Sequence, residues 1–322
     1  MAIVVTGASG FIASCLVEFL NLKGLTDLIL VDYFSRENKY NNLTDKYFTA
    51  KIDRDLFIHD IHRHSIDFIF HLGARTDTTE FNSEIFDRLN MNYSKILWKY
   101  ASENQIPFLY ASSAATYGSG EHWFSDEHSI EDLTPLNPYG QSKQSFDLWA
   151  TKQSSKPPFW VGLKFFNVFG PNEYHKGRMA SVVMHAFNQI KTNGSLKLFK
   201  SHHPNFNDGE QMRDFIYVKD LLNLMWFWYQ NQKDSGIYNA GSGEARTFND
   251  LAYAIFSALN IKPNISYIPT PEDIRNKYQY FTKASMEKTI SAGYNLPFYA
   301  LEDAVKDYVI HYLQNDTNFL IE

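Results

Sequence analysis

Tyr139 and Lys143 are two residues whose types and spacing suggest catalysis. They stand four residues apart at the start of a predicted helix, so their side chains would share one helix face. The ordinary pKa of a tyrosine is about 10. An ammonium group one turn away stabilises the tyrosinate, and we therefore expect Lys143 to move the pKa of Tyr139 toward neutrality. The pair predicts a general acid and base.

A serine stands at the end of the predicted strand that precedes this helix. Ser112 and Ser113 close the strand Phe108–Ser112, at the carboxyl edge where open parallel sheets bind ligands. The Ser113 hydroxyl can hydrogen-bond the oxygen of a reacting group. Ser113 and the Tyr139–Lys143 pair therefore predict a site that oxidises or reduces a carbon bearing oxygen.

A glycine-rich turn near the N-terminus predicts a dinucleotide cofactor for this redox site. Gly7, Gly10 and Ala13 form the pattern G-x-x-G-x-x-A between a strand and a helix. Glycines let the backbone approach a pyrophosphate, and the helix N-terminus offers amide donors and a positive dipole end. Asp32 ends the next strand, where a ribose-binding acid is expected. Lys143 would also hold the nicotinamide ribose.

The residues after the second strand leave the choice between NAD and NADP open. Asp32 favours NAD, because its carboxylate can accept hydrogen bonds from the adenosine ribose hydroxyls. Arg36, Lys39 and Arg54 are cations that could receive the 2′-phosphate of NADP. A phosphate beside a carboxylate costs roughly 1 to 4 kcal/mol, depending on screening. Two nearby cations could offset this repulsion, although a solvated basic loop is nearly as good an explanation.

Lys176 is a second titratable group in a position to do chemistry. It lies in the segment 174–181, after the Tyr139 helix and past the predicted cofactor-binding part of the chain. A second base at the substrate cleft would let an enzyme work on both faces of one carbon with a single recycled cofactor. That arrangement is typical of an epimerase. The alternative is an exposed loop lysine, which is where most lysines lie.

The elements expected around these residues alternate along the first 170 residues. Strands are predicted at Ile3–Thr6, Leu28–Val31, Asp67–His71, Phe108–Ser112 and Val161–Phe165, and helices at Phe11–Leu22, Asp55–His64, Ile85–Glu103 and Gln141–Gln153. This order predicts an α/β fold with a Rossmann-type, doubly wound parallel sheet. We assign residues 1–170 to a cofactor-binding domain, to which the chain returns around 213–245.

The remaining segments of 171–322 predict a smaller α+β substrate domain. Its expected strands are Leu196–Leu198, Phe215–Val218, Ile237–Asn239 and Ile265–Ile268, and its helices start near Met179, Asp220, Phe248 and Leu301. Asp220 has the residue type of a helix cap. The polar stretch His202–Gln211 contains Pro204 and Gly209 and is predicted to be a mobile loop.

Composition limits the partners and the compartment. The chain has 322 residues, a net charge of −6 and a single cysteine, Cys15. The charge argues against nucleic acid or an anionic membrane as a partner, and one cysteine excludes an internal disulfide. We expect a cytoplasmic protein that forms a homo-oligomer. His59, His62 and His64 stand among charged residues and favour a solvated helix face, so no metal site is predicted.

Several longer motifs resemble a known superfamily and one family within it. They are Gly7–Ala13, His71–Ala74, Thr78–Glu80, Phe108–Gly118, Tyr139–Lys143, Phe166–Ser181 and Tyr278–Thr282. Together they resemble the extended short-chain dehydrogenases/reductases. The stretch His175–Ser181 most resembles the ADP-L-glycero-D-manno-heptose 6-epimerases, and the likeness covers essentially the whole chain.

This resemblance implies an isomerase that uses an internal redox cycle. NADP would take a hydride from C6 of an ADP-heptose and return it to the opposite face, in the synthesis of heptose precursors of the lipopolysaccharide core. Tyr139 and Lys176 would be the two acid/base groups, with Ser113 on the substrate oxygen and Lys143 beside Tyr139. The residues implied to line the cofactor are Gly7, Gly10, Phe11, Ile12, Asp32, Tyr33, Lys39, Arg54, Leu72, Gly73, Ala74, Arg75, Thr76, Asn90, Lys143, Val168 and His175.

The resemblance also implies a nucleotide-sugar site. Its residues would be Asn167, Arg178, His185, Phe199, Lys200, Ser201, His202, Arg213 and Tyr278. Two positions depart from the family pattern. Tyr33 stands where the family commonly has an asparagine near the 2′-phosphate, and Arg178 stands where it has a serine.

Other functions remain alternatives at this point. A UDP-hexose 4-epimerase shares the scaffold but would need only Tyr139 and would not use Lys176. A 4,6-dehydratase needs an acid pair directly after the catalytic hydroxyl residue, where this chain has Ala114 and Ala115. A non-catalytic protein that senses a cofactor is a more remote alternative, because such proteins can lose the Tyr-x-x-x-Lys pair that this chain retains.

Overall fold

A seven-stranded parallel sheet forms the centre of the computed structural model, which describes residues 2–35, 37–275 and 278–315. The spatial order of its strands is β10-β6-β5-β4-β1-β2-β3, and all neighbours run parallel. Their bounds are β1 Ala2–Thr6, β2 Leu28–Asp32, β3 Ala50–Asp53, β4 Ile66–His71, β5 Phe108–Ser113, β6 Trp160–Phe165 and β10 Gly236–Ala240. The predicted Rossmann-type fold is confirmed.

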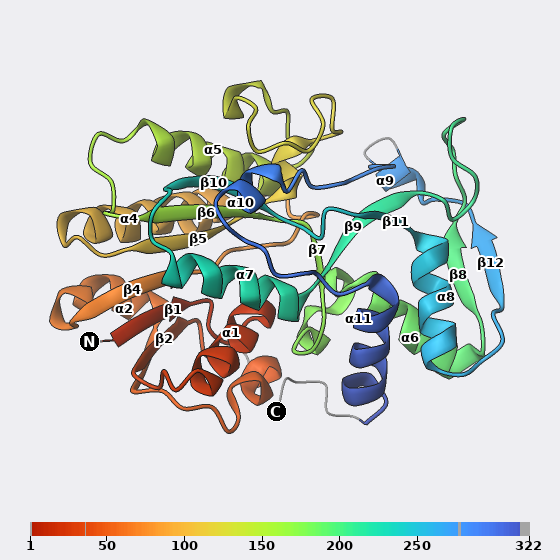
Figure 1. Ribbon diagram of the computed structural model, residues 1–322, viewed down its shortest axis with the longest axis horizontal. Helices are drawn as coiled ribbons and strands as arrows, with labels where there is room; N and C mark the ends of the chain where they lie inside the picture. The colour runs from red at the N-terminus through yellow and green to blue at the C-terminus, as the bar shows by residue number, and fades with distance from the viewer. Residues whose placement is uncertain (1, 36, 276–277, 316–322) are drawn as a thin grey trace.

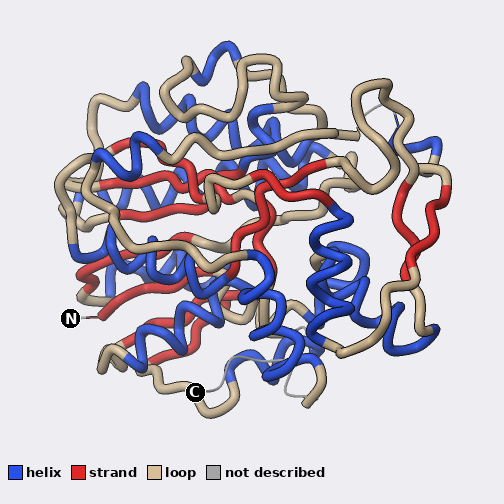
Figure 2. Tube along the Cα trace, turned by 45° about the vertical axis from the view of Figure 1, so that its right-hand side comes forward, coloured by secondary structure: helices blue, strands red, loops and turns tan. Residues whose placement is uncertain are grey.

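Helices cover both faces of this sheet, as Figure 2 shows. Successive strand residues point to opposite faces. In β1, Ile3 and Val5 therefore join one apolar cluster, while Ala2 and Val4 join another. The first cluster includes α1 (Phe11–Leu22) and α7 (Val218–Gln230), and the second includes α2 (Arg54–Asp60), α4 (Tyr93–Glu103) and α5 (Pro138–Lys152). Burial on both faces explains why the strands read as continuous apolar runs.

A second group of elements lies beside the large sheet, at the right of Figure 1. It holds a three-stranded sheet in the order β11-β9-β7 and the parallel pair β12-β8. Its strands are β7 Asn167–Phe169, β8 Leu196–Phe199, β9 Met212–Tyr217, β11 Ala245–Thr247 and β12 Ile265–Ile268. Its helices include α6 Val182–Asn193, α8 Phe248–Ala258, α9 Glu272–Arg275 and α11 Leu301–Asp307; α10 Glu287–Ser291 instead packs against β10.

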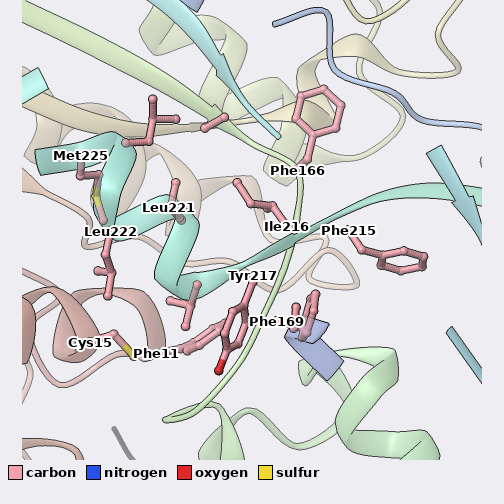
Figure 3. Close-up of a cluster of buried hydrophobic side chains, with 14 of the residues drawn as sticks. Phe11, Cys15, Phe166, Phe169, Phe215, Ile216, Tyr217, Leu221, Leu222 and Met225 are labelled. Atoms are coloured by element: carbon pink, nitrogen blue, oxygen red, sulfur yellow. The ribbon is translucent and has the colours of Figure 1, made fainter. Parts of the chain in front are cut away.

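One continuous apolar core joins the large sheet to the second group. Figure 3 shows this junction, where Phe11 and Cys15 of α1 approach Phe169 of β7 and Tyr217 of β9. All four side chains are buried, and the same cluster extends to Ile255 on α8. Close-packed side chains of this kind hold the two groups in a fixed relation.

Several predicted elements differ from the observed ones. The strands β3, β7 and β11 were not predicted, and they are only three or four residues long. The helix predicted at Ile85–Glu103 is divided into α3 (Ser83–Phe86), a π-helical segment Asp87–Asn92, and α4. The helix predicted at Asp55–His64 ends earlier, because α2 gives way at Ile61 to a 3₁₀ turn.

Helix starts were also displaced from their predicted residues. The helix expected near Met179 begins at Val182, since the Ser181 hydroxyl accepts the Met184 amide and caps it. Asp220 does not cap α7, which begins at Val218; its carboxylate instead accepts the backbone amide of Tyr299 at 3.0 Å. Burial raises the pKa of Asp220 to about 6.

The stretch predicted to be a mobile loop, His202–Gln211, has an organised structure. Its backbone makes internal hydrogen bonds from Phe206 to His203 and from Glu210 to Asn207. The rings of His203 and Phe206 pack against Tyr280, at 5.1 and 5.4 Å between ring centres.

Within the described ranges, no helix is long and apolar enough to cross a membrane.

Candidate active site

The end of β5 and the start of α5 bring Ser113, Tyr139 and Lys143 together. Asn137 caps α5 by accepting the Gly140 amide at 2.8 Å, and Pro138 suits the first helical position. A Cβ on Gly140 would lie 2.8 Å from the Ala115 carbonyl oxygen, so glycine is needed for α5 to pack this closely on the segment after β5. The Ser113 side chain hydrogen-bonds Tyr139 and thereby lowers the pKa of the phenol.

The predicted effect of Lys143 on Tyr139 is wrong for this structure. Burial dominates and raises the pKa of Tyr139 above its ordinary value, and Asp147 adds to the rise. The Lys143 ammonium donates to the Ala111 carbonyl at 2.9 Å. Burial lowers the pKa of Lys143 to about 8, against a smaller opposing effect of Asp147. Within the protein, therefore, Ser113 is the group that favours the tyrosinate.

A buried carboxylate that was not predicted lies beneath these residues. Asp147 of α5 is fully buried and accepts hydrogen bonds from Tyr110 Oη at 2.9 Å and Ser112 Oγ at 2.7 Å. The ammonium of Lys164 on β6 lies 3.3 Å from the same carboxylate. Asp147 thus links β5, β6 and α5. Asp147 stands one turn after Lys143, on the helix face that packs against the sheet. This spacing is the sequence feature from which a buried carboxylate near the site could have been predicted.

The glycine turn has the geometry of a phosphate cradle. Gly7 has a φ of 68°, and a Cβ there would lie 2.6 Å from Gly73 Cα. Gly10 is the N-cap of α1, and no side chain caps this helix in the part of the chain that the structure describes. The first amides of α1 can therefore serve a pyrophosphate, so the turn fits a dinucleotide.

The predicted ribose-binding acid lies directly beside this turn. Asp32 accepts hydrogen bonds from the Ser9 amide at 3.0 Å, from the Ser9 hydroxyl, and from the Tyr33 amide at 2.7 Å. The ammonium of Lys39 is 3.7 Å from the same carboxylate. Lys39 and Asp32 are therefore neighbours, as a cation near the ribose must be.

A second cation lies on the aromatic ring that follows Asp32. The Arg54 guanidinium is centred 5.3 Å from the Tyr33 ring, a cation–π distance. Arg54 Nε is buried and makes no hydrogen bond within the described residues, although an Asp55 carboxylate oxygen is 3.6 Å away. Arg36, the third predicted cation, lies outside the described residues.

A buried hydrogen-bond chain connects the glycine turn to the Tyr139 helix. The Gly73 amide donates to Thr6 Oγ1 at 3.1 Å, and Thr6 Oγ1 is 2.7 Å from His71 Nδ1. On its other side, His71 Nε2 is 2.8 Å from Ser94 Oγ, which donates to the Asn90 carbonyl at 2.6 Å. Because the Ser94 proton is used there, His71 must donate from Nε2 and accept at Nδ1.

The chain continues from Asn90 to α5. Asn90 holds Arg75 on both sides, with Oδ1 accepting the Arg75 amide at 2.8 Å and Nδ2 donating to the Arg75 carbonyl at 3.0 Å. Its Nδ2 also donates to Ser142 Oγ, and Ser142 Oγ donates to the Tyr139 carbonyl. Asn90 lies in the π-helical segment, a kind of irregularity common at functional sites. Thr6, Ser94 and Ser142 were missed because isolated hydroxyl residues carry no pattern.

The segment that carries Lys176 returns to the glycine turn. The Lys176 ammonium lies 5.3 Å from the centre of the Phe11 ring, at the first residue of α1. The lysine is partly buried, which argues against an ordinary surface residue. Burial lowers its pKa, and the Glu173 carboxylate opposes this change. Burial also lowers the pKa of His175 to about 4, with Lys39 and Lys176 acting in the same direction.

Part of the predicted nucleotide-sugar set is brought together in the second group of elements. The Arg213 guanidinium lies 5.3 Å from the ring centre of Tyr278. The ring centres of Phe199 and Tyr278 are 6.3 Å apart. Arg213 donates to the carbonyls of Met212 and Gln279, so part of its donor capacity is already used. Both of these contacts are with backbone carbonyl oxygens and not with carboxylates.

The other predicted substrate residues are distributed around this set. Lys200, Ser201 and His202 follow Phe199, and the His202 amide donates to the Tyr280 hydroxyl at 3.0 Å. Asn167 lies on β7 beside Val168, which was predicted to line the cofactor, and His185 lies on α6. Arg178 is exposed. Hydrogen bonds from Thr79 are the main cause that lowers the pKa of Asp77 in the loop after β4, and the charge of Arg178 adds a smaller effect.

The remaining cofactor-lining predictions fall on two segments that flank the turn. Ile12 follows Phe11 in α1, and the segment after β4 holds Leu72, Gly73, Ala74, Arg75 and Thr76.

No group of three or more His, Cys, Asp or Glu side chains that could hold a metal ion occurs in residues 2–35, 37–275 and 278–315.

Comparisons with known proteins identify relatives over nearly the whole chain. Residues 3–241 match the model of the NAD dependent epimerase/dehydratase family. The chain is similar to the ADP-L-glycero-D-manno-heptose-6-epimerase of Fusobacterium nucleatum, with 44% identity over 99% of this chain and 100% of that protein. It is 45% identical to the protein of the same name from Nitratidesulfovibrio vulgaris strain DP4, over 98% of this chain and 99% of that one.

Solved structures give the same fold. The ADP-L-glycero-D-manno-heptose-6-epimerase of Helicobacter pylori superposes with a TM-score of 0.81 at 28% identity, covering 96% of this chain and 95% of that one. A UDP-N-acetylglucosamine 4-epimerase from Methanobrevibacter ruminantium superposes with a TM-score of 0.83 at 24% identity, over 98% of both chains. The second likeness is evidence for the fold alone.

The buried imidazole in the hydrogen-bond chain gives a test by pH. Burial, with a smaller effect of Lys143, lowers the pKa of His71 to about 3, whereas the unfolded chain has the ordinary value of about 6.5. Between these values the unfolded state binds the extra proton, so acid should favour unfolding. The contribution of His71 to stability is complete above about pH 6.5 and falls by up to about 1.4 kcal/mol per pH unit below it.

Urea unfolding at several pH values from 7 to 4 measures this dependence. In His71→Gln the free energy of unfolding should be lower at pH 7, and its decline between pH 6 and 4 should be shallower than in the unchanged protein. Parallel curves for the two proteins would contradict a neutral, buried His71.

Proposed function

The chain belongs to the NAD dependent epimerase/dehydratase family and, within it, to the ADP-L-glycero-D-manno-heptose-6-epimerases, and we propose that it inverts C6 of an ADP-activated heptose. Identities of 41–45% over at least 95% of the chain to four proteins of this name support the assignment. The observation that supports the proposal is the position of the Lys176 ammonium, 5.3 Å from the centre of the Phe11 ring at the start of α1, where the cofactor would bind. The product would be a heptose precursor of the lipopolysaccharide core.

We propose NADP as the cofactor, with NAD as the alternative. The α1 amides and Gly7 would receive the pyrophosphate, and Asp32 would receive the adenosine ribose. Lys39, beside Asp32, and Arg54, whose buried Nε makes no hydrogen bond within the described residues, are suited to a 2′-phosphate because both are cations next to the ribose position. The nicotinamide, when bound, would accept a hydride from C6 and return it to the opposite face.

The chain's own residues would manage the proton and the charge of the C6 oxygen. One of Tyr139 and Lys176 removes the hydroxyl proton during oxidation, and the other supplies a proton after the ketone has turned. Ser113 donates a hydrogen bond to the same oxygen and also favours the tyrosinate. Lys143, held by the Ala111 carbonyl, would contact the nicotinamide ribose.

We further propose that the second group of elements binds the nucleotide-sugar. Arg213, stacked on Tyr278 near Phe199, would meet the ADP part, because a guanidinium can donate to two phosphate oxygens at once. Residues 1–170 would then form the cofactor domain except for β7, which belongs to the second group. The return predicted around 213–245 would be confined to α7 and β10, because β9 lies in the second sheet. The homo-oligomeric state and the cytoplasmic location remain predictions.

Removal of either base tests the proposed reaction. Tyr139→Phe and Lys176→Met should each slow epimerisation of ADP-heptose at C6 about 100-fold or more, because each loses one general acid/base. The assay is NMR or chromatographic analysis of the epimer ratio with time, with enzyme-bound cofactor measured in each variant. Lys152→Met, an exposed lysine on α5, is the control and should retain the unchanged rate.

Two outcomes would contradict this assignment. A near-normal rate for Lys176→Met would remove the second base from the mechanism. Inversion of UDP-glucose at C4 with no turnover of ADP-heptose would reassign the substrate class and leave the fold unaffected.

Substitution of Lys39 tests the cofactor. Lys39→Ala should weaken NADP binding about tenfold or more and change NAD binding much less, since only NADP carries the 2′-phosphate. Titration calorimetry of cofactor-stripped protein gives both affinities. Lys51→Ala is the matched control. It also removes one lysine charge, but the Lys51 ammonium contacts the Phe34 ring, 4.4 Å from the ring centre, so binding of both cofactors should stay unchanged. Equal losses for the two cofactors, or tighter NAD binding by the unchanged protein, would assign the site to NAD.

A further inference from the structure

A second fully buried carboxylate, that of Glu173, lies directly before the segment that carries Lys176. Its two oxygens accept the Ser181 hydroxyl at 2.6 Å, the Ser181 amide at 2.5 Å and the Gly170 amide at 3.4 Å. The Tyr308 hydroxyl, in the helical segment that continues α11, also donates to it. A carboxylate buried this completely is costly unless such donors surround it.

The backbone of Glu173 acts on the same segment. Its carbonyl accepts the Lys176 amide at 2.9 Å and begins the 3₁₀ turn Tyr174–Met179. Its carboxylate holds both ends of the surrounding loop, at Gly170 and at Ser181. One residue therefore fixes where the loop starts, where it ends, and where Lys176 stands within it.

The loop is also attached to the first helix of the chain. Asn172 donates to Ser14 Oγ of α1 at 2.7 Å, and the Pro171 carbonyl accepts Cys15 Sγ at 3.4 Å. Glu173 completes this attachment on the opposite side through Tyr308. The loop is thus held between α1 and the C-terminal helix, with the Lys176 ammonium over Phe11.

We propose that Glu173 is a positioning residue for the second acid/base group: it fixes the Tyr174–Met179 turn and supplies a negative charge that stabilises the Lys176 ammonium. Its consequence for catalysis rests on the proposed function. Burial raises the pKa of Glu173, while Ser181, Lys176 and Gly170 act in the opposite direction. The mutual attraction of Glu173 and Lys176 stabilises the charged form of both groups.

Other titratable groups surround this pair, and Lys39 and Asp32 act on His175, the neighbour of Lys176. Cys15 faces Glu173 from α1, and burial raises the pKa of its thiol well above the ordinary range. Tyr308 faces it from the C-terminal helix, and burial likewise raises the pKa of the phenol. His175, the neighbour of Lys176, has a pKa of about 4. Near neutral pH these three groups are uncharged, and Glu173 is the carboxyl group that favours the charged form of Lys176.

The pH dependence of Lys176 acetylation tests the proposal. The protein, with its bound cofactor, is treated with trace acetic anhydride from pH 6 to 11, and mass spectrometry follows labelling of the Lys176 peptide. In Glu173→Gln, which keeps the shape but removes the charge, the labelling midpoint should fall by about one pH unit or more. Glu173→Asp, which keeps a carboxylate, should lie between. Lys197, an exposed residue, is the internal control.

Tyr308→Phe separates charge from packing. This variant removes one donor and leaves the carboxylate, so its Lys176 midpoint should stay at the unchanged value. The pH at which kcat declines on the alkaline side should follow the labelling midpoint of Lys176 in every variant. A merely structural role of Glu173 would not produce this agreement. Circular dichroism and cofactor content show which variants are folded.

Specific results would overturn the proposal. They are a Glu173→Gln midpoint equal to that of the unchanged protein, or an equal shift in Tyr308→Phe. If the glutamine variant does not fold, a Glu173→Asp midpoint at or above the unchanged value would overturn the proposal in its place. Absence of ADP-heptose turnover by the unchanged protein would overturn the proposed function instead, and the labelling midpoints would still decide what Glu173 does to Lys176.

Discussion

The fold must hold the segment after β7 against two distant elements at once. The Pro171 carbonyl and the Asn172 side chain form hydrogen bonds with α1, while the Glu173 carboxylate accepts a hydrogen bond from Tyr308. This double attachment helps to place the Lys176 ammonium over Phe11, at the glycine turn. The continuous core at the junction of α1, β7 and β9 supports the attachment (Figure 3), so both ends of the chain contribute to the position of one lysine.

A second constraint fixes Tyr139 relative to the glycine turn. The buried chain through His71, Ser94, Asn90 and Ser142 runs from the Gly73 amide to the backbone of Tyr139. Every group in it is committed to a partner, and a broken link would leave a buried polar atom unsatisfied. The cofactor turn and α5 are therefore held in register by hydrogen bonds as well as by the sheet.

The sequence predicted the parallel sheet, its main helices and the Ser113–Tyr139–Lys143 cluster, because periodicity and strand ends are local signals. Short strands such as β7 were not predictable, since three residues have no period of their own. The π-helical segment and the role of Glu173 depend on partners far along the chain, which no local pattern records. The expected effect of Lys143 on Tyr139 failed for a similar reason: helix spacing predicts proximity, but burial determines the sign of the pKa change.

The central claim is that two proton-handling groups serve one internal hydride transfer. The most direct measurement is the conversion of ADP-heptose to its C6 epimer in D₂O, without added cofactor, followed by NMR and mass spectrometry of the product. An internal redox cycle returns the original hydrogen to C6, so the product should carry protium there, and turnover should need no external nicotinamide. Deuterium at C6 would show that a base removes the carbon-bound proton directly, and it would contradict an internal hydride transfer.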